Sequence, residues 1–254
     1  VAAAVAVLKR LCVISGGPGT GKTSTVLRIL ALLTGQVGTR PLRVALAAPT
    51  GKAAARLQEA IRAAKPSLGL KPERLAQIPE EAFTLHRLLG ARPNSVYFRH
   101  DRDNPLPLDV LVVDEVSMVG LALMAKTVAA LPPIARLILL GDKDQLASVE
   151  AGAVLGEICA GAGGFSPEFQ VRLEALTGEG LPRGRAVISP LTDTIVLLKH
   201  SYRFSATSGI GALAQAVNRG KASDALVLLE GMTHEDIAWR TLADPNELAE
   251  QIEE

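Results

Sequence analysis

The residues most able to do chemistry form a phosphate-binding pattern near the start of the sequence. Residues 16–23 read Gly-Gly-Pro-Gly-Thr-Gly-Lys-Thr, which fits G-x-x-x-x-G-K-[ST]. In such a loop the backbone N–H groups cradle the phosphates of ATP or GTP, while the lysine reaches the same oxygens and the hydroxyl binds Mg²⁺. The expected nucleotide contacts are Gly17, Pro18, Gly19, Thr20, Gly21, Lys22, Thr23 and Ser24.

The flanking residues support this assignment. An apolar run at residues 11–15 has the length of a strand, and residues 24–33 carry apolar side chains at helical spacing. Strand, loop and helix are the context that the motif requires, which speaks against a chance glycine-rich turn.

Two carboxylates follow a second apolar strand, Val110–Val113. In a parallel sheet ligands bind at the carboxyl ends of strands, so we expect Asp114 to hold Mg²⁺ and Glu115 to orient and deprotonate the attacking water. Taken alone, the pair also fits a helix N-cap and a first-turn acid.

Two further residues are candidates for γ-phosphate contact. Gln145 follows the apolar strand 137–140 and could sense hydrolysis, although Gly141–Asp144 also reads as an ordinary turn. Arg203 follows a later strand and could act as an arginine finger, or pack as a structural residue on Tyr202 or Phe204.

Composition favours an α/β fold with a parallel sheet flanked by helices. Apolar residues make up 48% of the chain but aromatics only 3%, so valine, leucine, isoleucine and alanine must build the core. We expect helices at residues 1–8, 52–64, 83–89, 121–131, 152–159, 209–218, 222–229 and 245–254. Further strands are expected at 42–48, 109–114, 135–141, 194–198 and 236–241, with a small β-hairpin at about 91–108 and a flexible segment at about 160–190.

Charge, hydropathy and cysteines narrow the class of protein. Residues 1–110 hold 16 Lys and Arg against 7 Asp and Glu (+9), and the remainder holds 11 against 19 (−8). A basic half that carries the nucleotide loop is compatible with a phosphate-rich partner, but equally with a solvated surface.

No apolar run reaches the 18 or so residues of a membrane span, so no membrane partner is expected. Two distant cysteines and no Cys/His zinc spacing favour a cytoplasmic protein without disulfides.

Six motifs in order resemble those of superfamily-one DNA helicases, and in detail those of the RecD family, the alpha subunits of exodeoxyribonuclease V (RecBCD). They are residues 16–23, 48–54, 84–90, 112–118, 141–152 and 201–204. The resemblance implies a RecA-like P-loop NTPase that uses ATP and Mg²⁺ to move 5′→3′ on single-stranded DNA. It also implies partner subunits and a role in double-strand-break repair and recombination.

Roles carry over residue by residue from this resemblance. Lys22 and Thr23 would bind phosphate and Mg²⁺, Asp114 and Glu115 would be the metal and catalytic carboxylates, Gln145 the γ-phosphate sensor and Arg203 the arginine finger. Pro49, Thr50, Gly51, Thr84, Leu85 and His86 would lie along the DNA backbone, which N–H and O–H groups can bind without reading sequence. His86 could equally be a buried core histidine.

The resemblance also sets the expected domains. Residues 1–190 would form the first RecA-like ATPase domain, and residues 191–254 the truncated start of a second. The hairpin would correspond to the small domain that splits the duplex. With no initiator Met and no second-lobe motifs, we expect a piece of a longer protein that does not unwind DNA alone. A nucleotide-gated binding module and an RNA helicase remain alternatives.

Overall fold

The computed structural model describes residues 1–36, 40–145, 154–160, 164–182, 189–204, 208–231 and 234–239. The chain divides into two compact units, Val1–His200 and Ser201–Glu254. Among the described residues, every helix is too short or too polar to span a bilayer.

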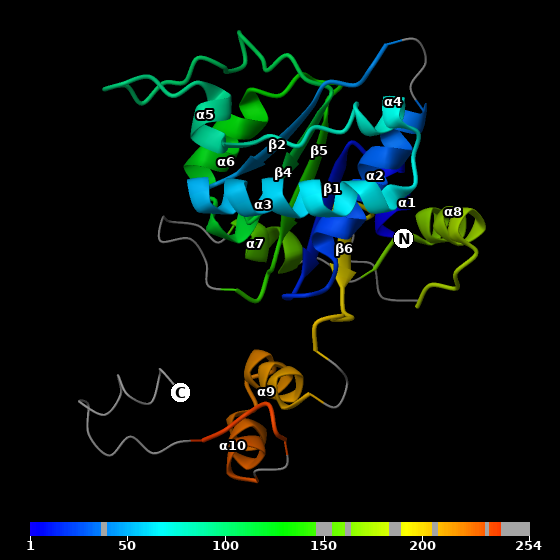
Figure 1. Ribbon diagram of the computed structural model, residues 1–254, viewed down its shortest axis with the longest axis vertical. Helices are drawn as coiled ribbons and strands as arrows, with labels where there is room; N and C mark the ends of the chain where they lie inside the picture. Colours follow the sequence, from blue (N-terminus) through cyan, green and yellow to red (C-terminus); the bar gives the residue numbers. More distant parts are fainter. Residues whose placement is uncertain are drawn as a thin grey trace. The chain divides into compact units, whose positions relative to one another are not determined.

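A six-stranded parallel sheet forms the centre of the first unit (Figure 1). Its strands are β1 Leu11–Gly16, β2 Val44–Ala48, β3 Ala82–Thr84, β4 Val110–Val113, β5 Arg136–Gly141 and β6 Ile195–Leu198. Their order across the sheet is β3-β2-β4-β5-β1-β6, and every neighbouring pair is parallel. The RecA-like α/β sheet predicted from the sequence is therefore confirmed.

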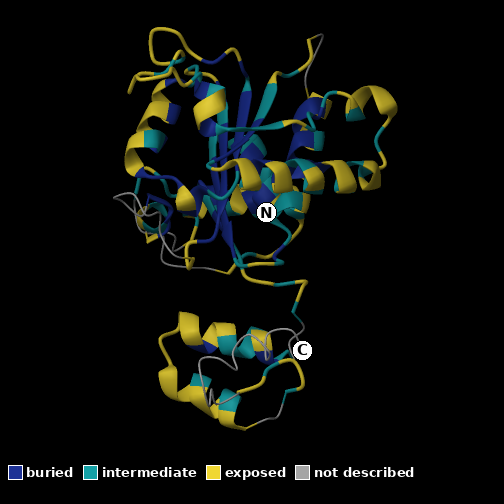
Figure 2. Cartoon of the chain, turned by 60° about the vertical axis from the view of Figure 1, so that its left-hand side comes forward, coloured by how far each residue is buried: buried dark blue, intermediate teal, exposed yellow. Residues whose placement is uncertain are grey.

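Helices cover both faces of this sheet because its strands alternate their apolar side chains between two cores. Cys12 and Ile14 face one core and Val13 the other. The first core is covered by α1 Ala2–Leu8, α2 Lys22–Gln36, α3 Gly51–Ala64 and α8 Pro167–Thr177, and the second by α5 Leu85–Leu89, α6 Leu121–Ala129 and α7 Val154–Ala160. Figure 2 shows the buried strands between helices whose outer faces are exposed. A short α4 spans Pro72–Leu75.

The helix predicted at 83–89 begins two residues later than expected, because a strand precedes it. Thr84 is extended, and its side chain accepts a hydrogen bond from the Arg87 N–H, so the helix starts at Leu85. Ala82–Thr84 instead pair with β2 as the edge strand β3. Gly90 ends α5 with a positive φ of 73°, as its glycine predicted.

The prediction of a regular β-hairpin at 91–108 is wrong. A single antiparallel bridge joins Ala91 to Phe98, and the rest of the segment consists of turns and bends. Prolines at 93, 105 and 107 lack the N–H group that a strand ladder needs. The loop is held at its base, where Arg99 N–H donates to Gly90 O at 2.9 Å.

The segment predicted as flexible at 160–190 contains a helix. Ser166 caps α8 by accepting from the Phe169 N–H, Pro167 occupies the first turn, and Phe169 and Leu173 are buried in the first core. Residues 161–163 and 183–188 lie outside the described part.

The boundary predicted between residues 190 and 191 also moves. Strand β6 pairs with β1 and completes the edge of the first sheet, so the first unit continues to His200. The physical reason is burial: an apolar strand gains more against β1, where Val196 is buried, than it would alone.

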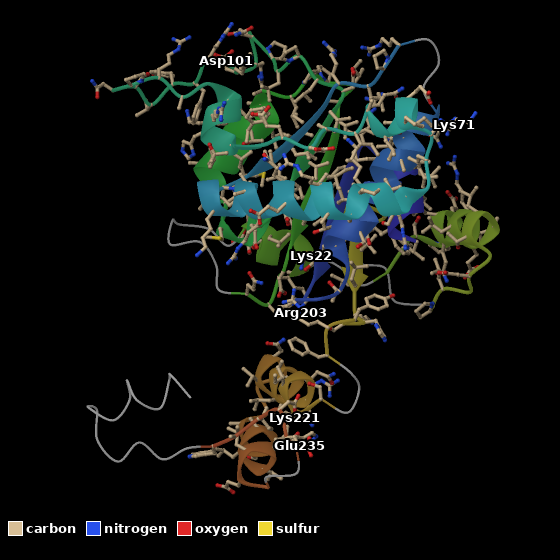
Figure 3. The ribbon with its side chains drawn as sticks, in the orientation of Figure 1. Lys22, Lys71, Asp101, Arg203, Lys221 and Glu235 are labelled. Carbon is tan, nitrogen blue, oxygen red and sulfur yellow. The ribbon has the colours of Figure 1, made fainter. Side chains whose placement is uncertain are left out.

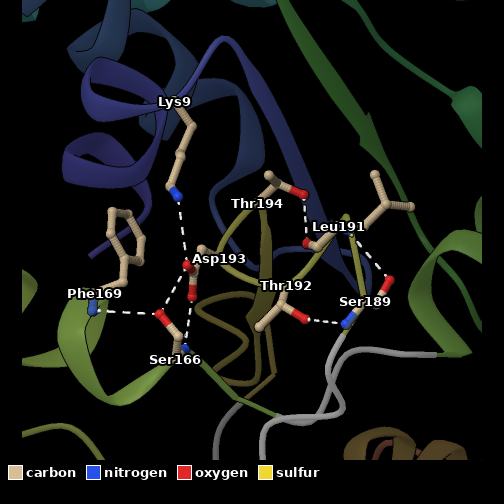
Figure 4. Close-up of polar contacts among 8 residues, drawn as sticks. All are labelled: Lys9, Ser166, Phe169, Ser189, Leu191, Thr192, Asp193 and Thr194. Carbon is tan, nitrogen blue, oxygen red and sulfur yellow. Dashed lines mark hydrogen bonds and ion pairs between the residues drawn. The ribbon is translucent and has the colours of Figure 1, made fainter.

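Asp193 secures the start of β6 to two other elements (Figure 4). Its carboxylate accepts from Ser166 N–H at 2.6 Å and Ser166 Oγ at 2.9 Å, and forms an ion pair with Lys9 Nζ at 3.4 Å. The Lys9 ammonium also lies 4.2 Å from the centre of the Phe169 ring. One carboxylate thus ties the end of α1 and the start of α8 to the sheet.

The second unit contains α9 Gly209–Asn218 and α10 Ala222–Glu230, as predicted to within one residue. Asp236 accepts from the N–H groups of Gly209 and Ile210 and from the Ser208 hydroxyl, so it caps α9. This capping turn replaces the start of the strand predicted at 236–241. Residues 240–241 and the helix predicted at 245–254 lie outside the described residues.

Candidate nucleotide-binding site

Three adjacent strands, β4, β5 and β1, bring the predicted nucleotide residues to one edge of the sheet. In the parallel register Val113 pairs with Leu139 and Ser15 with Gly141, so β4 ends two residues before β5, and β1 ends one residue after it. Beyond those ends lie Asp114 and Glu115, Gln145, and the loop that leads to Lys22 at the start of α2. Lys22 is labelled in Figure 3. Carboxyl ends of parallel strands are where α/β proteins bind ligands.

The phosphate loop has a backbone conformation that requires glycine at two positions. Gly19 and Gly21 have positive φ values of 72° and 79°, which glycine adopts without strain. Thr20 is buried, and its hydroxyl donates to Gly17 O at 2.8 Å, which closes the turn. The loop therefore holds its shape through its own contacts.

Lys22 donates its ammonium hydrogens to the loop itself. Its Nζ lies 2.6 Å from Gly16 O and 3.2 Å from Gly17 O. These two contacts hold the ammonium against the backbone of the loop.

Asp114 is a half-buried carboxylate directly after β4. Its N–H donates to Ala47 O at 2.9 Å, and its Oδ1 accepts from Glu115 N–H at 2.8 Å. Burial raises the pKa of Asp114, and the nearby Glu115 charge adds to this, whereas the Glu115 N–H and the charge of Lys22 lower it.

Glu115 adopts a left-handed backbone with φ 54° and ψ 40°, which is uncommon outside glycine and costs conformational energy. It starts the short 3-10 turn Val116–Met118, whose first two residues are buried. Buried packing thus holds the carboxylate in a conformation that an isolated chain would rarely adopt.

Gln145 is exposed and closes a turn after β5. Its N–H donates to Asp142 O at 3.3 Å, while the buried Asp142 side chain accepts from Asp144 N–H at 3.1 Å. The later part of this motif, residues 146–152, lies outside the described residues.

The residues expected along DNA lie at the ends of the neighbouring strands β2 and β3, where Ala48 pairs with Thr84. Thr50 and Thr84 each cap a helix, because their hydroxyl oxygens accept from the N–H groups of Ala53 and Arg87. Pro49 is half-buried and Gly51 is exposed at the start of α3.

His86 is exposed, so it is not the core histidine of the alternative reading. Its ring centre lies 5.8 Å from that of Phe98. Arg203 is exposed in the second unit, where its N–H donates to Ser201 Oγ at 3.3 Å. It is not among the residues that the first sheet brings together.

Sequence reasoning missed Ser15, whose buried hydroxyl accepts from Lys143 N–H at 3.0 Å. The available signal was a lone polar residue inside the apolar run before the phosphate loop.

A family model described as an AAA domain matches residues 1–151, more than half of the chain. The chain belongs to the AAA domain family. The matched residues include Lys22, Asp114 and Gln145, and family membership implies nucleotide binding.

Curated relatives specify the resemblance further. The chain is 44% identical over 260 residues to RecBCD enzyme subunit RecD from Haemophilus influenzae, a match that covers 99% of this chain and 40% of that protein. It is 49% identical over 243 residues to RecBCD enzyme subunit RecD from Mycolicibacterium smegmatis, covering 94% and 38%. The predicted resemblance to RecD proteins is confirmed, and the chain spans about two fifths of the length of these relatives.

A solved structure described as Bacteroides Pif1 bound to ssDNA aligns with a TM-score of 0.46 and 19% identity, over 94% of this chain and 49% of that one. A TM-score below 0.5 is too low to assign a fold by comparison. The fold of this chain is therefore assigned from its own sheet topology.

Proposed function

We propose that this chain carries the ATP site of a RecD-type DNA helicase subunit that moves 5′→3′ on single-stranded DNA. The rest of that protein, and the other subunits of an exodeoxyribonuclease V complex, would complete the machine in the cytoplasm for double-strand-break repair and recombination. On its own, this chain is expected to bind nucleotide weakly and not to unwind DNA.

The observation that supports this most directly is the order β4-β5-β1. It sets a carboxylate pair, a glutamine and a phosphate loop side by side at one edge of a parallel sheet. A nucleoside triphosphate needs these groups together: donors for its phosphates, oxygen ligands for its metal, and a base for water.

The donor set fits ATP with Mg²⁺. The Lys22 ammonium already bonds two carbonyl oxygens, and phosphate oxygens can take their place. The Thr23 hydroxyl and the Asp114 carboxylate are hard oxygen ligands of the kind that Mg²⁺ accepts, and bound metal would neutralise developing phosphate charge. The raised pKa of Asp114 fits a carboxylate that is stabilised when a cation lies beside it.

The remaining residues have roles consistent with their positions. Glu115 would take the proton of the attacking water, Gln145 would contact the γ-phosphate or that water, and Arg203 would stabilise transition-state charge as an arginine finger. Pro49, Thr50, Gly51, Thr84 and His86 would contact the DNA backbone from the ends of β2 and β3. The hydroxyl groups of Thr50 and Thr84 and the N–H of Gly51 suit phosphate contacts that carry no sequence information.

The test compares nucleotide binding and Mg-ATP hydrolysis by this chain with and without oligo-dT, for wild type, Lys22→Ala and Lys52→Ala. Lys52 is exposed on α3 and serves as the matched control. We expect Lys22→Ala to weaken nucleotide binding by about tenfold or more, the range for hydrogen bonds from a charged group, and Lys52→Ala to have no such effect.

Equal nucleotide affinity in wild type and Lys22→Ala would overturn the proposed ATP site. Hydrolysis that responds to RNA but not to DNA would replace the DNA helicase by an RNA helicase. Efficient DNA unwinding by the chain alone would contradict the expected need for the rest of the protein.

A further inference from the structure

The Ser15 hydroxyl joins three elements at the centre of the first unit. Ser15 is the penultimate residue of β1 and only 1% exposed. Its Oγ accepts from the backbone N–H of Lys143, in the loop after β5, at 3.0 Å. The same hydroxyl hydrogen-bonds the thiol of Cys159 on the buried side of α7.

The loop that Ser15 holds is the one that carries Gln145. Lys143 lies between Asp142, which is buried, and Asp144, whose N–H donates to the Asp142 carboxylate. Gln145 N–H then donates to the Asp142 carbonyl oxygen. The turn therefore has two anchors, one internal through Asp142 and one to the phosphate-loop strand through Ser15.

The second anchor holds the turn that carries Gln145 against the strand that leads into the phosphate loop. Ser15 is followed directly by Gly16, whose carbonyl oxygen accepts from Lys22 Nζ. A single side chain therefore links the strand that leads into the phosphate loop to the turn that presents Gln145. Backbone pairing between Ser15 and Gly141 aligns the strands but does not reach the turn itself.

We propose that Ser15 is a positioning residue that holds Gln145 at the height of the γ-phosphate, so that the site distinguishes a triphosphate from a diphosphate. This rests on the proposed function, because it assumes that Gln145 contacts the γ-phosphate. Ser15 touches no nucleotide itself and acts through the Lys143 N–H.

Replacing Ser15 with alanine removes the hydroxyl oxygen that accepts the hydrogen bond from the Lys143 N–H. The phosphate loop keeps its glycines, the Thr20 contact and Lys22, so diphosphate binding should persist. The loss should fall on the γ-phosphate contact alone. A defect confined to the third phosphate separates positioning from a general loss of folding.

The experiment measures the affinity of this chain for fluorescent ADP and for a fluorescent non-hydrolysable ATP analogue, both with Mg²⁺. Its variants are wild type, Ser15→Ala, Gln145→Ala and the double variant. The control is Thr34→Val, which deletes a buried hydroxyl bonded to Leu30 O near the far end of α2. We expect Ser15→Ala to lower the preference for the triphosphate about three- to tenfold, the range of one hydrogen bond, while ADP affinity stays within about twofold.

We further expect Gln145→Ala to lower the preference by a similar factor and the double variant to add nothing, since both changes remove one coupled contact. Thr34→Val should leave the preference unchanged. If Ser15→Ala does not fold, Ser15→Cys replaces it with the same expectation, because a thiol is a weak donor and acceptor.

Three results would overturn the inference: an unchanged preference in the Ser15 variant, additive effects of Ser15 and Gln145, or a wild type that binds both nucleotides equally. Failure of the proposed function would look different, because Lys22→Ala would then bind both nucleotides as tightly as wild type.

Discussion

Gly16 and Leu198 are partners in adjacent parallel strands, and no side chain fits between them. A Cβ atom at Gly16 would stand 2.9 Å from Leu198 Cβ and 3.0 Å from Leu198 O, and 2.6 Å from Thr20 Oγ1. The glycine that opens the phosphate loop therefore also lets β6 approach the sheet, so the motif and the last strand depend on the same missing side chain.

Gly16→Ala should destabilise the first unit, because either β6 or the loop must move to admit the methyl group. We expect a loss of about 1–3 kcal/mol in the free energy of unfolding, the usual cost of overpacking, and weaker nucleotide binding. Urea unfolding and nucleotide titration measure the two effects. For the unfolding measurement Gly17→Ala is the control, since nothing lies within 4 Å of a Cβ there. Equal losses in both variants would disprove the packing explanation.

Asp114→Asn should make the protein without nucleotide more stable at pH 7. Burial raises the pKa of Asp114, so the fold favours its protonated form and the ionised form costs stability at neutral pH. The amide removes that cost, by about 0.5–2 kcal/mol, and this advantage shrinks as pH falls through the raised pKa.

The same substitution should abolish Mg²⁺-dependent nucleotide binding, because an amide is a poorer metal ligand than a carboxylate. Urea unfolding between pH 4 and pH 8, with and without Mg-nucleotide, tests both the gain in stability and the loss of Mg²⁺-dependent nucleotide binding. A variant less stable than wild type at pH 7 would show that the carboxylate is structural.

Asp109 should make the fold sensitive to acid. Hydrogen bonds from Arg43, followed by Arg40, hold the pKa of Asp109 far below its usual range despite burial. Its contribution to stability is therefore complete above the unfolded-state pKa of about 4 and is lost as pH falls below it. We expect the stability difference between wild type and Asp109→Asn to shrink from pH 7 to pH 3. The exposed Asp103→Asn should show no such trend; a constant difference for Asp109→Asn would contradict the ion pairs.

His86→Ala should weaken binding of single-stranded DNA about three- to tenfold and leave nucleotide affinity unchanged. The ring is exposed beside Phe98, at the end of the sheet where Thr50 and Thr84 cap their helices. Fluorescence anisotropy of labelled oligo-dT measures the change. His100→Ala is the control from the following loop, where the ring contacts Asn104 O. Equal DNA affinity in wild type and His86→Ala would remove His86 from the proposed DNA path.

Asp193→Ala should cost about 1–3 kcal/mol of unfolding free energy, because it leaves Ser166 N–H and Lys9 without their acceptor. Asp193 has a φ of 73°, which asparagine also tolerates, so Asp193→Asn should lose less. Chemical unfolding compares them, with Arg62→Ala as an exposed ion-pair control expected to change stability by about 0–1 kcal/mol. Equal costs for Ala and Asn would show that the lost negative charge, and neither the backbone conformation nor the remaining acceptor oxygen, sets the energy.

Local patterns predicted most elements of the fold because two signals depend only on neighbouring residues. These are the spacing of apolar side chains and the residue types that end helices and strands. The buried run Val110–Val113 predicted β4, and the predicted helix at 83–89 ends where Gly90 caps α5. The segment 91–108 failed for the opposite reason. Its aromatic and β-branched residues suggested strands, but its prolines, and the partners available in space, left only the Ala91–Phe98 bridge.

The sequence by itself was enough to predict nucleotide binding, because the phosphate loop is a contiguous motif whose backbone conformation is allowed by its own glycines. Only the tertiary structure decided what stands beside that loop. Strand order set β5 between β4 and β1, and placed β6 on the other side of β1. Ser15 reached Lys143, and Asp193 reached Ser166, only because strands and helices far apart in the chain pack together. Long-range pairing is settled by burial of the whole sheet, and no local run of residues encodes it.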